Sequence, residues 1–470
     1  MNSSSPDPRA YDLVVLGGGP AGTCGAGTAA VFGRRVALVE KEPEVGGAGL
    51  LTGTVPSKTL RETALALSGW RSRKLFGVDL SLRREATIAD FMRHEQRVSE
   101  GESQRLTRRL DRLSVERIQG TASFVDPHTV RVRRRDALDL LLRGEKILVA
   151  TGSAPYRPPQ FPFEDDRVHD SDELLHLKEL PRRLLVVGAG VIGSEYACTF
   201  AALGVEVHLM DREDRLLPFL DGEVSRALEA AMMAGGVHFH WGETVTHCDL
   251  SQPGKVRLTL SNGAARECDG VLVCAGRSRN TDDLDLAAAG IVPGKRGLIP
   301  VDAHYATTAG HIYAAGDVVG APALAATGME QARVAMCHAF GLGFKADLSP
   351  LLPTGIYTIP EVGMVGETEE SLRQQGVDYL VGRACYADNP RGRIVGDDTG
   401  FLKLLFRRED QRLLGVHVLG ELATELVHPG LIAMLAQAGA DTFNRACFNY
   451  PTLGDLYKSA TYDALLQRHG

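Results

Sequence analysis

The strongest constraint on the fold is a glycine-rich turn that occurs twice. Its first copy, Gly17-Gly18-Gly19-Pro20-Ala21-Gly22, follows the apolar run 12–16 and precedes the small-residue stretch 25–31. The second copy begins at Gly188, which is 171 positions after Gly17. Each apolar run predicts a buried parallel strand, and each following segment predicts a helix packed closely on a sheet. One duplicated unit explains this spacing better than two unrelated turns.

Both copies match the pattern Gly-x-Gly-x-x-Gly, in which each glycine has its own physical reason. The first permits a tight turn, the second lets a pyrophosphate approach the backbone, and the third lets helix and strand touch. The helix N-terminus supplies unpaired N–H groups and partial positive charge for that pyrophosphate. We therefore predict two dinucleotide sites. Their glycines are Gly17, Gly19 and Gly22 in the first, and Gly188, Gly190 and Gly193 in the second.

An acidic residue ends the second predicted strand of each unit. The strand at 35–39 ends at Glu40, and the strand at 205–210 ends at Asp211, again 171 positions later. A carboxylate at this point suits the ribose hydroxyls of an adenosine. Two such sites in one chain are typical of an oxidoreductase that holds FAD tightly and exchanges a nicotinamide nucleotide, NAD or NADP.

The residues after the second strand bear on nucleotide choice. Asp211 favours the 2′-hydroxyl of NAD, and it would repel the phosphate of NADP by about 4 kcal/mol per pair of unit charges near 4 Å. Arg212 and Arg215 follow it and could offset that repulsion by pairing with the phosphate. We expect both nucleotides to be used. The alternative is that both arginines are solvated and NAD is preferred.

Other segments outline the rest of the architecture. Buried strands are predicted at 147–151 and 272–275, with a strand-to-helix turn at 313–317, and the charged segment 71–117 is predicted to form long helices. After about residue 345 the pattern changes, and strands at 362–365 and 401–406 with later apolar helices predict a mixed α+β domain.

Composition and charge exclude several classes of protein. The formal net charge of −7 argues against a general nucleic-acid or anionic-membrane surface. No run reaches about 18 apolar residues, and the polar start lacks the features of a signal peptide. The eight cysteines form no Cys-x-x-Cys pair, so we expect reduced thiols in a cytoplasmic protein. The 14 histidines show no metal-ligand spacing, so no metal is expected.

The order of these motifs resembles the class I pyridine nucleotide-disulfide oxidoreductases, the family of glutathione reductase and dihydrolipoamide dehydrogenase. The similarity runs from residue 12 to about 464. Ala150-Thr151-Gly152-Ser153 resembles the family's crossover between domains, and Gly276-Arg277-x-x-Asn280-Thr281 resembles the return. Gly316-Asp317 resembles the turn that contacts the flavin ribityl chain. The resemblance thus adds cofactor-binding residues. They are Thr151, Gly152, Gly276, Gly316 and Asp317.

The resemblance also implies the domain organisation. We expect an α/β fold with two doubly wound, Rossmann-like nucleotide-binding domains, the second inserted in the first, and a C-terminal α+β dimerisation domain. The FAD-binding domain would comprise 1–150 and 280–345. The NAD(P)-binding domain would comprise 151–279, and the interface domain 346–470. A homodimer is expected by the same analogy.

Two departures from the family pattern remove its thiol chemistry. The family carries two cysteines just before a Pro-Ser-Lys; here Gly49 and Thr54 stand at those positions. The family's C-terminal His-Pro-Thr reads Tyr450-Pro451-Thr452, and its accompanying Glu is Asp455. A thiol relay needs a sulfur and a base, so disulfide reduction is not expected.

These losses point to one branch of the family. Thr54, Tyr450 and the stretch 353–361 resemble the soluble pyridine nucleotide transhydrogenases, although members of that branch keep the first cysteine, where this chain has Gly49. The resemblance implies reversible, ping-pong hydride transfer from NADPH through FAD to NAD+. The alternatives are an NAD(P)H dehydrogenase that reduces a quinone or another small acceptor, and a flavin-containing binding protein without turnover.

Four residues carry over as catalytic candidates. Lys58 and Glu195 match a family pair beside flavin N5, where the lysine stabilises negative charge on reduced flavin. The alternative makes both residues ordinary solvated helix charges. Tyr450 would line the side of the flavin that a disulfide occupies in the family, or it would be a structural tyrosine at a dimer interface. Thr54, at the position of the second family cysteine, is the fourth candidate. Val191 stands where some relatives place an aromatic lid, and a packing role is equally open.

Overall fold

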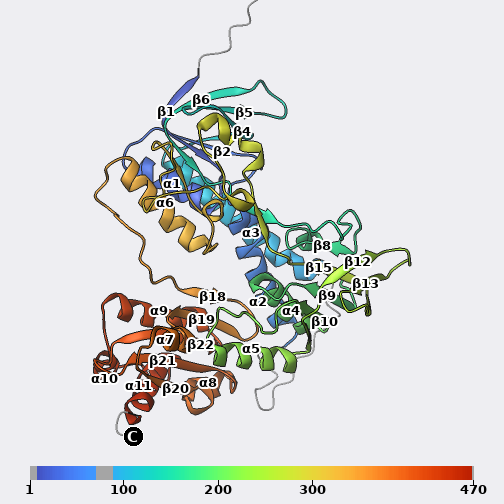
Figure 1. Ribbon diagram of the computed structural model, residues 1–470, viewed down its shortest axis with the longest axis vertical. Coiled ribbons are helices and arrows are strands. Elements are labelled where there is room, and N and C mark those ends of the chain that lie inside the picture. The colour runs from blue at the N-terminus through green and yellow to red at the C-terminus, as the bar shows by residue number, and fades with distance from the viewer. Residues whose placement is uncertain (1–7, 70–87, 468–470) are drawn as a thin grey trace, which may run out of the picture. The chain divides into compact units, whose positions relative to one another are not determined.

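The computed structural model describes residues 8–69 and 88–467, which group into two compact units. The first unit comprises 1–56, 95–156 and 276–349, and the second comprises 57–94, 157–275 and 350–470. Figure 1 shows their helices and strands, labelled where there is room. Each unit is built around parallel strands, as the duplicated sequence pattern predicts.

The first unit contains a seven-stranded sheet, whose parallel part includes the first glycine-rich strand-turn-helix unit. The strand order is β3-β2-β1-β6-β5-β4, and β17 also pairs with β6. β1 runs parallel to both β2 and β6, while β4 and β5 form an antiparallel extension. A further antiparallel pair joins β7 to β16. The strands are β1 Arg9–Leu16, β2 Val36–Glu40, β3 Glu116–Gln119, β4 Thr121–Asp126, β5 Thr129–Arg133, β6 Leu140–Val149, β7 Ser153–Pro155, β16 Arg277–Arg279 and β17 Ile312–Ala314.

Helices α1 (Pro20–Val31) and α6 (Ala325–Ala339) pack together against this sheet. A Cβ on Gly25 would lie 2.3 Å from Leu148 Cδ2 of the sheet and 3.5 Å from Ala332 Cβ of α6. Small residues therefore bring α1 into contact with both neighbours, and the predicted close packing of helix on sheet is confirmed. The contact fixes where the helix N-terminus points, which places the first glycine turn.

The second unit repeats the order of the first three parallel strands, with β11-β10-β9 corresponding to β3-β2-β1. Its parallel sheet reads β11-β10-β9-β15-β8, with β10 parallel to both neighbours, and α4 and α5 pack against it. A three-stranded antiparallel sheet, β12-β13-β14, accompanies it. The elements are β8 Val168–His169, β9 Arg183–Val187, α4 Val191–Ala202, β10 Glu206–Asp211, α5 Gly222–Ala234, β11 Val237–Trp241, β12 Val245–Asp249, β13 Val256–Leu260, β14 Ala265–Cys268 and β15 Gly270–Val273.

The C-terminal part of the second unit is a five-stranded antiparallel sheet with helices. Its order is β18-β19-β22-β21-β20, and α9 and α11 pack on it. The strands predicted at 362–365 and 401–406 lie inside β19 and β21, so the expected α+β character is confirmed. The elements are β18 Thr354–Ile356, β19 Glu361–Gly366, β20 Tyr379–Cys385, β21 Phe401–Arg407, β22 Leu413–Gly420, α9 Ala423–Leu435 and α11 Leu456–Leu466.

The expected helices of segment 71–117 are found only in part. Residues 71–87 of the predicted helical segment 71–117 lie outside the described residues. Helix α3 occupies Ile88–Arg112, but the helical prediction is wrong at 116–117, which begin β3 and pair with β2. Among the described residues, no helix is both long and apolar enough to span a bilayer. The other helices are α2 Thr54–Leu67, α7 Glu369–Gln375, α8 Pro390–Val395 and α10 Ala440–Arg445.

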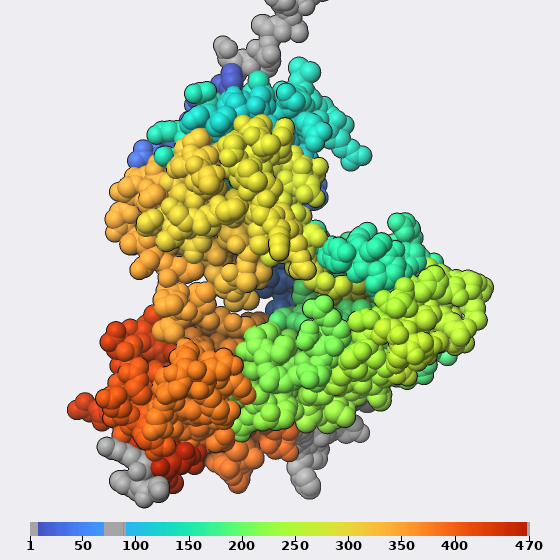
Figure 2. Space-filling view, viewed as in Figure 1, coloured from blue at the N-terminus to red at the C-terminus, as the bar shows by residue number. Residues whose placement is uncertain are grey.

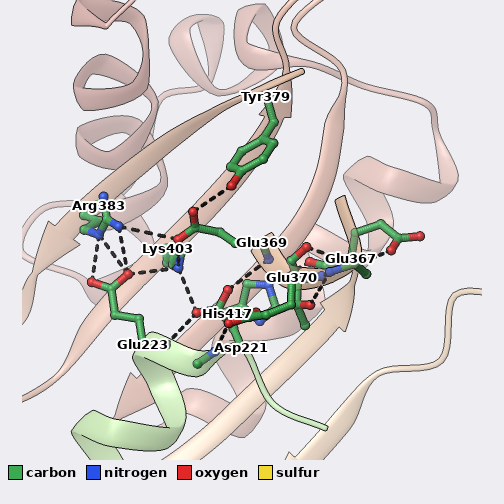
Figure 3. Close-up of polar contacts among 12 residues, drawn as sticks. Asp221, Glu223, Glu367, Glu369, Glu370, Tyr379, Arg383, Lys403 and His417 are labelled. Atoms are coloured by element: carbon green, nitrogen blue, oxygen red, sulfur yellow. Dashed lines mark hydrogen bonds and ion pairs between the residues drawn. The ribbon is translucent and has the colours of Figure 1, made fainter. Parts of the chain in front are cut away.

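A buried lysine joins the parallel and antiparallel sheets of the second unit (Figure 3). Lys403 of β21 is fully buried, and its Nζ lies 2.8 Å from Asp221 Oδ1, 2.9 Å from Glu223 Oε2 and 2.6 Å from Glu369 Oε1. The ammonium therefore lies among the three carboxylates that are close enough to share a cation. In the space-filling view, the green surface around α5 adjoins the orange surface of the C-terminal sheet (Figure 2).

Candidate functional site

In the first glycine turn, contacts within the protein explain why the first and third residues are glycine, but not the middle one. Gly17 has φ +104°, and a Cβ there would lie 2.4 Å from Ala150 O. A Cβ on Gly22 would lie 1.9 Å from Gly17 O, so helix and strand touch there. Gly19 has φ −73°, and a Cβ there would meet only Gly47 Cα, at 3.9 Å. The protein leaves room for a side chain at Gly19, yet the residue is glycine. This fits a pyrophosphate that approaches the backbone closely at that point.

The second glycine turn has the same geometry. Gly188 also has φ +104°, with a Cβ position 2.4 Å from Cys274 O, and a Cβ on Gly193 would lie 1.9 Å from Gly188 O. Gly190 has φ −71°, and no described atom lies within 4 Å of its Cβ position. The repeated contacts bear out the sequence duplication in three dimensions. Both turns therefore fit the phosphates of a dinucleotide.

The acids at the strand ends are held by their own glycine turns. Glu40 Oε2 accepts a hydrogen bond from Gly18 N at 2.6 Å, and Asp211 Oδ2 accepts one from Ala189 N, also at 2.6 Å. Each carboxylate is thus fixed beside the start of its helix, α1 or α4. This is where an adenosine ribose lies when its pyrophosphate rests on the helix N-terminus.

The two arginines after β10 do not contact Asp211 in this structure. Arg212 is 78% exposed at its side chain and pairs with Glu213 at 3.2 Å. The Arg215 guanidinium donates to the carbonyl oxygen of Pro218. An exposed pair of this kind is weak, so the Arg212 side chain is free to rotate toward a ligand at little cost. Glu213, which the sequence interpretation did not consider, competes for it.

A row of hydrogen-bonded polar side chains links β14, β11 and β10. Arg266 donates to His240 Nδ1 at 3.2 Å, His240 Nε2 lies 2.9 Å from His208 Nδ1, and His208 Nε2 lies 3.1 Å from Glu206 Oε1. A guanidinium only donates and a carboxylate only accepts, so both imidazoles are neutral Nε2–H tautomers. Burial lowers the pKa of His240, and the charge of Arg266 lowers it further. We assign these four side chains no part in hydride transfer.

The crossover and return segments meet in the first unit. Asn280 Nδ2 donates to Thr151 O at 2.9 Å, and Asn280 N donates to Gly152 O at 3.0 Å. Gly152 and Gly276 have φ of +70° and +107°, with no described atom within 4 Å of either Cβ position. Thr151 Oγ1 is buried and has no hydrogen-bond partner among the described residues. An unpaired buried hydroxyl beside bare backbone fits a ligand that supplies the missing partner.

The predicted turn at Gly316 and Asp317 is held from three sides. Gln331 of α6 accepts from Gly316 N at 2.8 Å, and Arg279 donates to Asp317 O at 3.1 Å. Ser153 Oγ donates to the Asp317 carboxylate, and Arg277 Nε donates to the same hydroxyl at 2.7 Å. Crossover, return and turn thus form one hydrogen-bonded group in the first unit.

Lys58 and Glu195 form an ion pair, as the resemblance implied. Lys58 Nζ of α2 lies 2.5 Å from Glu195 Oε2 of α4, and the side chains are 25% and 7% exposed. A charge pair this enclosed is screened far less than a surface pair. The prediction that the two residues meet is therefore confirmed, while their role beside a flavin stays a prediction. Val191, at the start of α4, is partly buried against the hydrophobic core.

The positions of the missing cysteines differ in their surroundings. Gly49 is buried in a π-helical turn, Ala48–Thr52, and a Cβ there would lie 2.4 Å from Pro20 Cγ of the first glycine turn. Thr54 is exposed and begins α2. A side chain at position 49 would therefore collide with the phosphate cradle, whereas one at position 54 has room.

Tyr450 is 77% exposed on the single chain. It precedes the short helical turn Leu453–Asp455, which leads into α11. The structure does not bring Tyr450 to Lys58 or Glu195 by any contact within the described chain. Its expected place beside a flavin needs a partner subunit and stays a prediction.

Several residues with structural roles at the site escaped the sequence interpretation. Gln331 holds the Gly316 turn, and Tyr357 contacts both Lys58 and Glu195. Arg61 of α2 is buried and bonds Thr358 O at 3.0 Å. One signal for Arg61 was present in the sequence: it lies three residues after Lys58 and so shares its helix face. Gln331 carried no local signal, and Tyr357 lies in the stretch 353–361 that the resemblance marked, although no role was assigned to it there.

Comparison with known proteins decides the family. The model of the pyridine nucleotide-disulphide oxidoreductase family matches residues 11–339, and that of the family's dimerisation domain matches residues 352–461. The chain belongs to this family. The resemblance seen in the sequence and the α/β fold that it implied are confirmed.

Individual relatives are similar along nearly the whole chain. A soluble pyridine nucleotide transhydrogenase of Mycobacterium tuberculosis is 44% identical over 460 residues, which is 97% of each chain. One of Colwellia psychrerythraea is 38% identical over 97% of this chain and 98% of the relative. Among solved structures, LpdA from Mycobacterium tuberculosis has a TM-score of 0.89 at 27% identity, covering 97% of this chain and 99% of its own. The flavoprotein disulfide reductase RclA from Escherichia coli has a TM-score of 0.87 at 27% identity, covering 96% and 99%.

Proposed function

We propose that this chain is an FAD-dependent soluble transhydrogenase that moves hydride reversibly between NADPH and NAD+. The observation that carries the proposal is a pair of matching dinucleotide cradles in a chain whose thiol positions are Gly49 and Thr54. With no sulfur at these positions, an electron pair has no thiol relay to a disulfide substrate. The names of the full-length relatives support the same activity.

The chain would hold FAD in the first cradle and a nicotinamide nucleotide in the second. Bound FAD would supply the redox chemistry, accepting a hydride from one nicotinamide and returning it to another. Gly17, Gly19, Gly22 and Glu40 would bind the adenosine and pyrophosphate of the first. Gly188, Gly190, Gly193 and Asp211 would do so for the second. Both nucleotides would bind in turn at the same site. This gives a ping-pong cycle, for which double-reciprocal plots of the initial rate show parallel lines.

The crossover group would hold the rest of the flavin nucleotide. Thr151 Oγ1, the bare backbone at Gly152 and Gly276, and the Gly316-Asp317 turn are the groups with room or with an unpaired atom. Lys58 would place a positive charge beside the flavin ring, and the Glu195 carboxylate fixes that ammonium at 2.5 Å. Thr54 and a partner subunit's Tyr450 would complete the side of the ring that lacks a disulfide.

The two nucleotides would be recognised by different side chains. The carboxylate would accept from the 2′-hydroxyl of NAD. The 2′-phosphate of NADP would be bound by Arg212, rotated away from Glu213, and by Arg215.

We place the FAD-binding domain at 1–150 and 280–345, the NAD(P)-binding domain at 151–279, and the interface domain at 346–470. The dimerisation-domain match supports a homo-oligomer, for which we propose a dimer in the cytoplasm. No nucleic acid or membrane partner is proposed, in keeping with a net charge of −7.

The test uses purified yellow protein without oxygen. NADPH and a chromogenic NAD+ analogue are added, and reduction of the analogue is compared with reduction of a quinone and of a disulfide. Fast reduction of the analogue with parallel initial-rate lines supports the proposal. Fast quinone reduction with slow reduction of the analogue assigns the chain to the NAD(P)H dehydrogenases, and disulfide turnover or a chain that cannot bind FAD contradicts both.

A further inference from the structure

We propose that Tyr357 is a positioning residue: its ring and its backbone amide hold the Lys58–Glu195 pair and thereby set the electrostatic field at the bound flavin. The inference rests on the proposed function for the location of that flavin. It concerns this chain's own contacts, because all three residues lie in the second unit.

Three contacts connect the three residues pairwise. Lys58 Nζ lies 2.5 Å from Glu195 Oε2. Glu195 Oε1 accepts a hydrogen bond from Tyr357 N at 2.9 Å. The Lys58 ammonium also lies 4.9 Å from the centroid of the Tyr357 ring, a cation–π distance. Both carboxylate oxygens are therefore occupied, and the ammonium is held by the carboxylate, by the ring and by Ser57 Oγ, which accepts from it at 3.2 Å.

The segment that carries Tyr357 is itself fixed to the helix that carries Lys58. Arg61 Nε donates to Thr358 O at 3.0 Å, and Arg61 NH1 lies 3.2 Å from Glu361 Oε1. The other oxygen of Glu361 accepts from Thr424 Oγ1 of α9 at 2.9 Å. Lys58 and Arg61 lie on the same face of α2, so the segment from Tyr357 to Glu361 has two anchors on one helix. This leaves the ring little freedom to move away from the ammonium.

The attraction comes from the face of a neutral ring. Burial raises the pKa of the Tyr357 phenol, so no phenolate charge takes part at neutral pH. The ring's negative quadrupole favours a cation over its face, and the contact strengthens as water is excluded. Lys58, at 25% side-chain exposure, is largely enclosed. Without the ring, Glu195 and the Ser57 hydroxyl, which accepts from Lys58 Nζ at 3.2 Å, would orient the ammonium, and the long lysine side chain would regain part of its conformational freedom.

Side-chain replacement separates the two contacts of Tyr357. The hydrogen bond to Glu195 comes from the backbone, so it survives any substitution that keeps the backbone conformation just after β18. Tyr357→Phe keeps the ring face, and Tyr357→Leu removes it. Tyr379→Leu is the matched control, because it makes the same change in β20, at the opposite edge of the sheet from β18, which ends one residue before Tyr357. The double variant with Lys58→Met shows whether Tyr357 acts through the lysine.

The readouts are the midpoint potential of the bound flavin in the holoenzyme and its single-turnover rate of reduction by NADPH across pH. We expect Tyr357→Leu to lower the reduction equilibrium about 3- to 30-fold, the range that one cation–π contact supplies. A tenfold loss corresponds to a shift of about 30 mV toward negative potential for a two-electron couple. Tyr357→Phe and Tyr379→Leu should stay within about twofold of wild type, and Tyr357→Leu should have no further effect when Lys58 is already Met.

Two results overturn the inference. One is a potential for Tyr357→Leu that matches the Tyr379→Leu control. The other is an equal shift in the Lys58→Met background, which means that the ring acts independently of the lysine. If Tyr357→Leu fails to fold, fluorinated phenylalanines at position 357 keep the volume and weaken only the quadrupole; a potential that does not fall with fluorination also overturns it.

Failure of the proposed function gives a different outcome. A wild-type enzyme that NADPH reduces, but that does not pass hydride to NAD+, disproves transhydrogenation and leaves the Tyr357 measurements valid. Rapid transhydrogenation with no effect of the ring on the potential disproves the inference alone.

Discussion

Lys403 and Asp221 form a fully buried ion pair, with Nζ 2.8 Å from Oδ1 and side-chain exposures of 0% and 1%. The lysine comes from the C-terminal sheet, and the aspartate caps α5 of the parallel sheet by accepting from Glu223 N. Burial alone would raise the pKa of Asp221, but the hydrogen bond and charge of Lys403, together with the hydrogen bond from Glu369 N and the other nearby groups, outweigh it, so the pKa is lowered. His417, buried beside them, donates through Nε2 to Glu367 O at 2.8 Å (Figure 3).

Removing the buried ammonium should destabilise the second unit. Lys403→Met leaves three carboxylates without their shared cation, and breaking a buried pair in this way costs about 3–5 kcal/mol. We expect a clear drop in the urea midpoint, partly restored by adding Asp221→Asn. Lys178→Met, which removes an exposed pair with Asp166, is the control and should leave the midpoint unchanged. Equal midpoints for the two lysine variants would contradict the assigned role.

The neutral histidine chain should make stability depend on pH. Burial lowers the pKa of His240 below its ordinary value of 6.5. A base with a lowered pKa stays neutral in the folded chain while the unfolded chain takes up its proton, so the free energy of unfolding decreases as pH falls below about 6.5. Between pH 7 and 5, His240→Gln should lose less stability than wild type. Burial also lowers the pKa of His417, so the wild type and the His240→Gln variant should both keep part of the dependence of the unfolding free energy on pH. Identical slopes would disprove the contribution of His240.

Restoring the first family cysteine should damage the flavin cradle. The Cβ of Gly49→Cys would lie 2.4 Å from Pro20 Cγ, and overpacking of this kind costs about 1–3 kcal/mol. We expect a lower thermal midpoint and less bound FAD. Thr54→Cys, at an exposed position, should be neutral in both measurements. Full FAD content and an unchanged midpoint in the Gly49 variant would show that Pro20 yields.

The middle glycines should separate the two nucleotide sites. Gly190→Ala meets no described atom within 4 Å, so the fold should survive while the added methyl blocks the pyrophosphate. We expect the KM for NADPH to rise about tenfold with FAD content unchanged. Gly19→Ala should instead lower FAD content. Gly193→Ala is the structural control, because its Cβ would collide with Gly188 O and lower the unfolding midpoint.

The arginines after β10 should matter for one nucleotide only. Replacing Arg212 and Arg215 together by alanine removes two cations from the 2′-phosphate, and charged hydrogen bonds contribute about 1.5–3 kcal/mol each. The KM for NADPH should rise at least tenfold, while the KM for NADH stays within about twofold. Arg445→Ala, another exposed arginine, is the control. An unchanged KM for NADPH would show that the two arginines are merely solvated.

The duplicated glycine turns were predictable from the sequence because their requirements are local. Gly17 and Gly188 must adopt positive φ, and Gly22 and Gly193 must admit a strand at contact distance, so these demands are written into residue type at fixed spacing. The replaced cysteines and the acids at the strand ends can likewise be recognised from the residue type at single positions. The family and its fold followed from these features.

The contacts between distant segments depended on the tertiary structure. Lys58 and Glu195 are 137 positions apart, and Tyr357 lies 162 positions beyond Glu195. Resemblance paired the first two, but no local pattern could place the Tyr357 ring over the ammonium or Pro20 against Gly49. Such contacts arise from how separate helices and strands pack, and packing selects partners by shape and burial rather than by spacing. Residue types along the chain therefore determined what this protein binds, and the packed fold decided which side chains hold its charges in place.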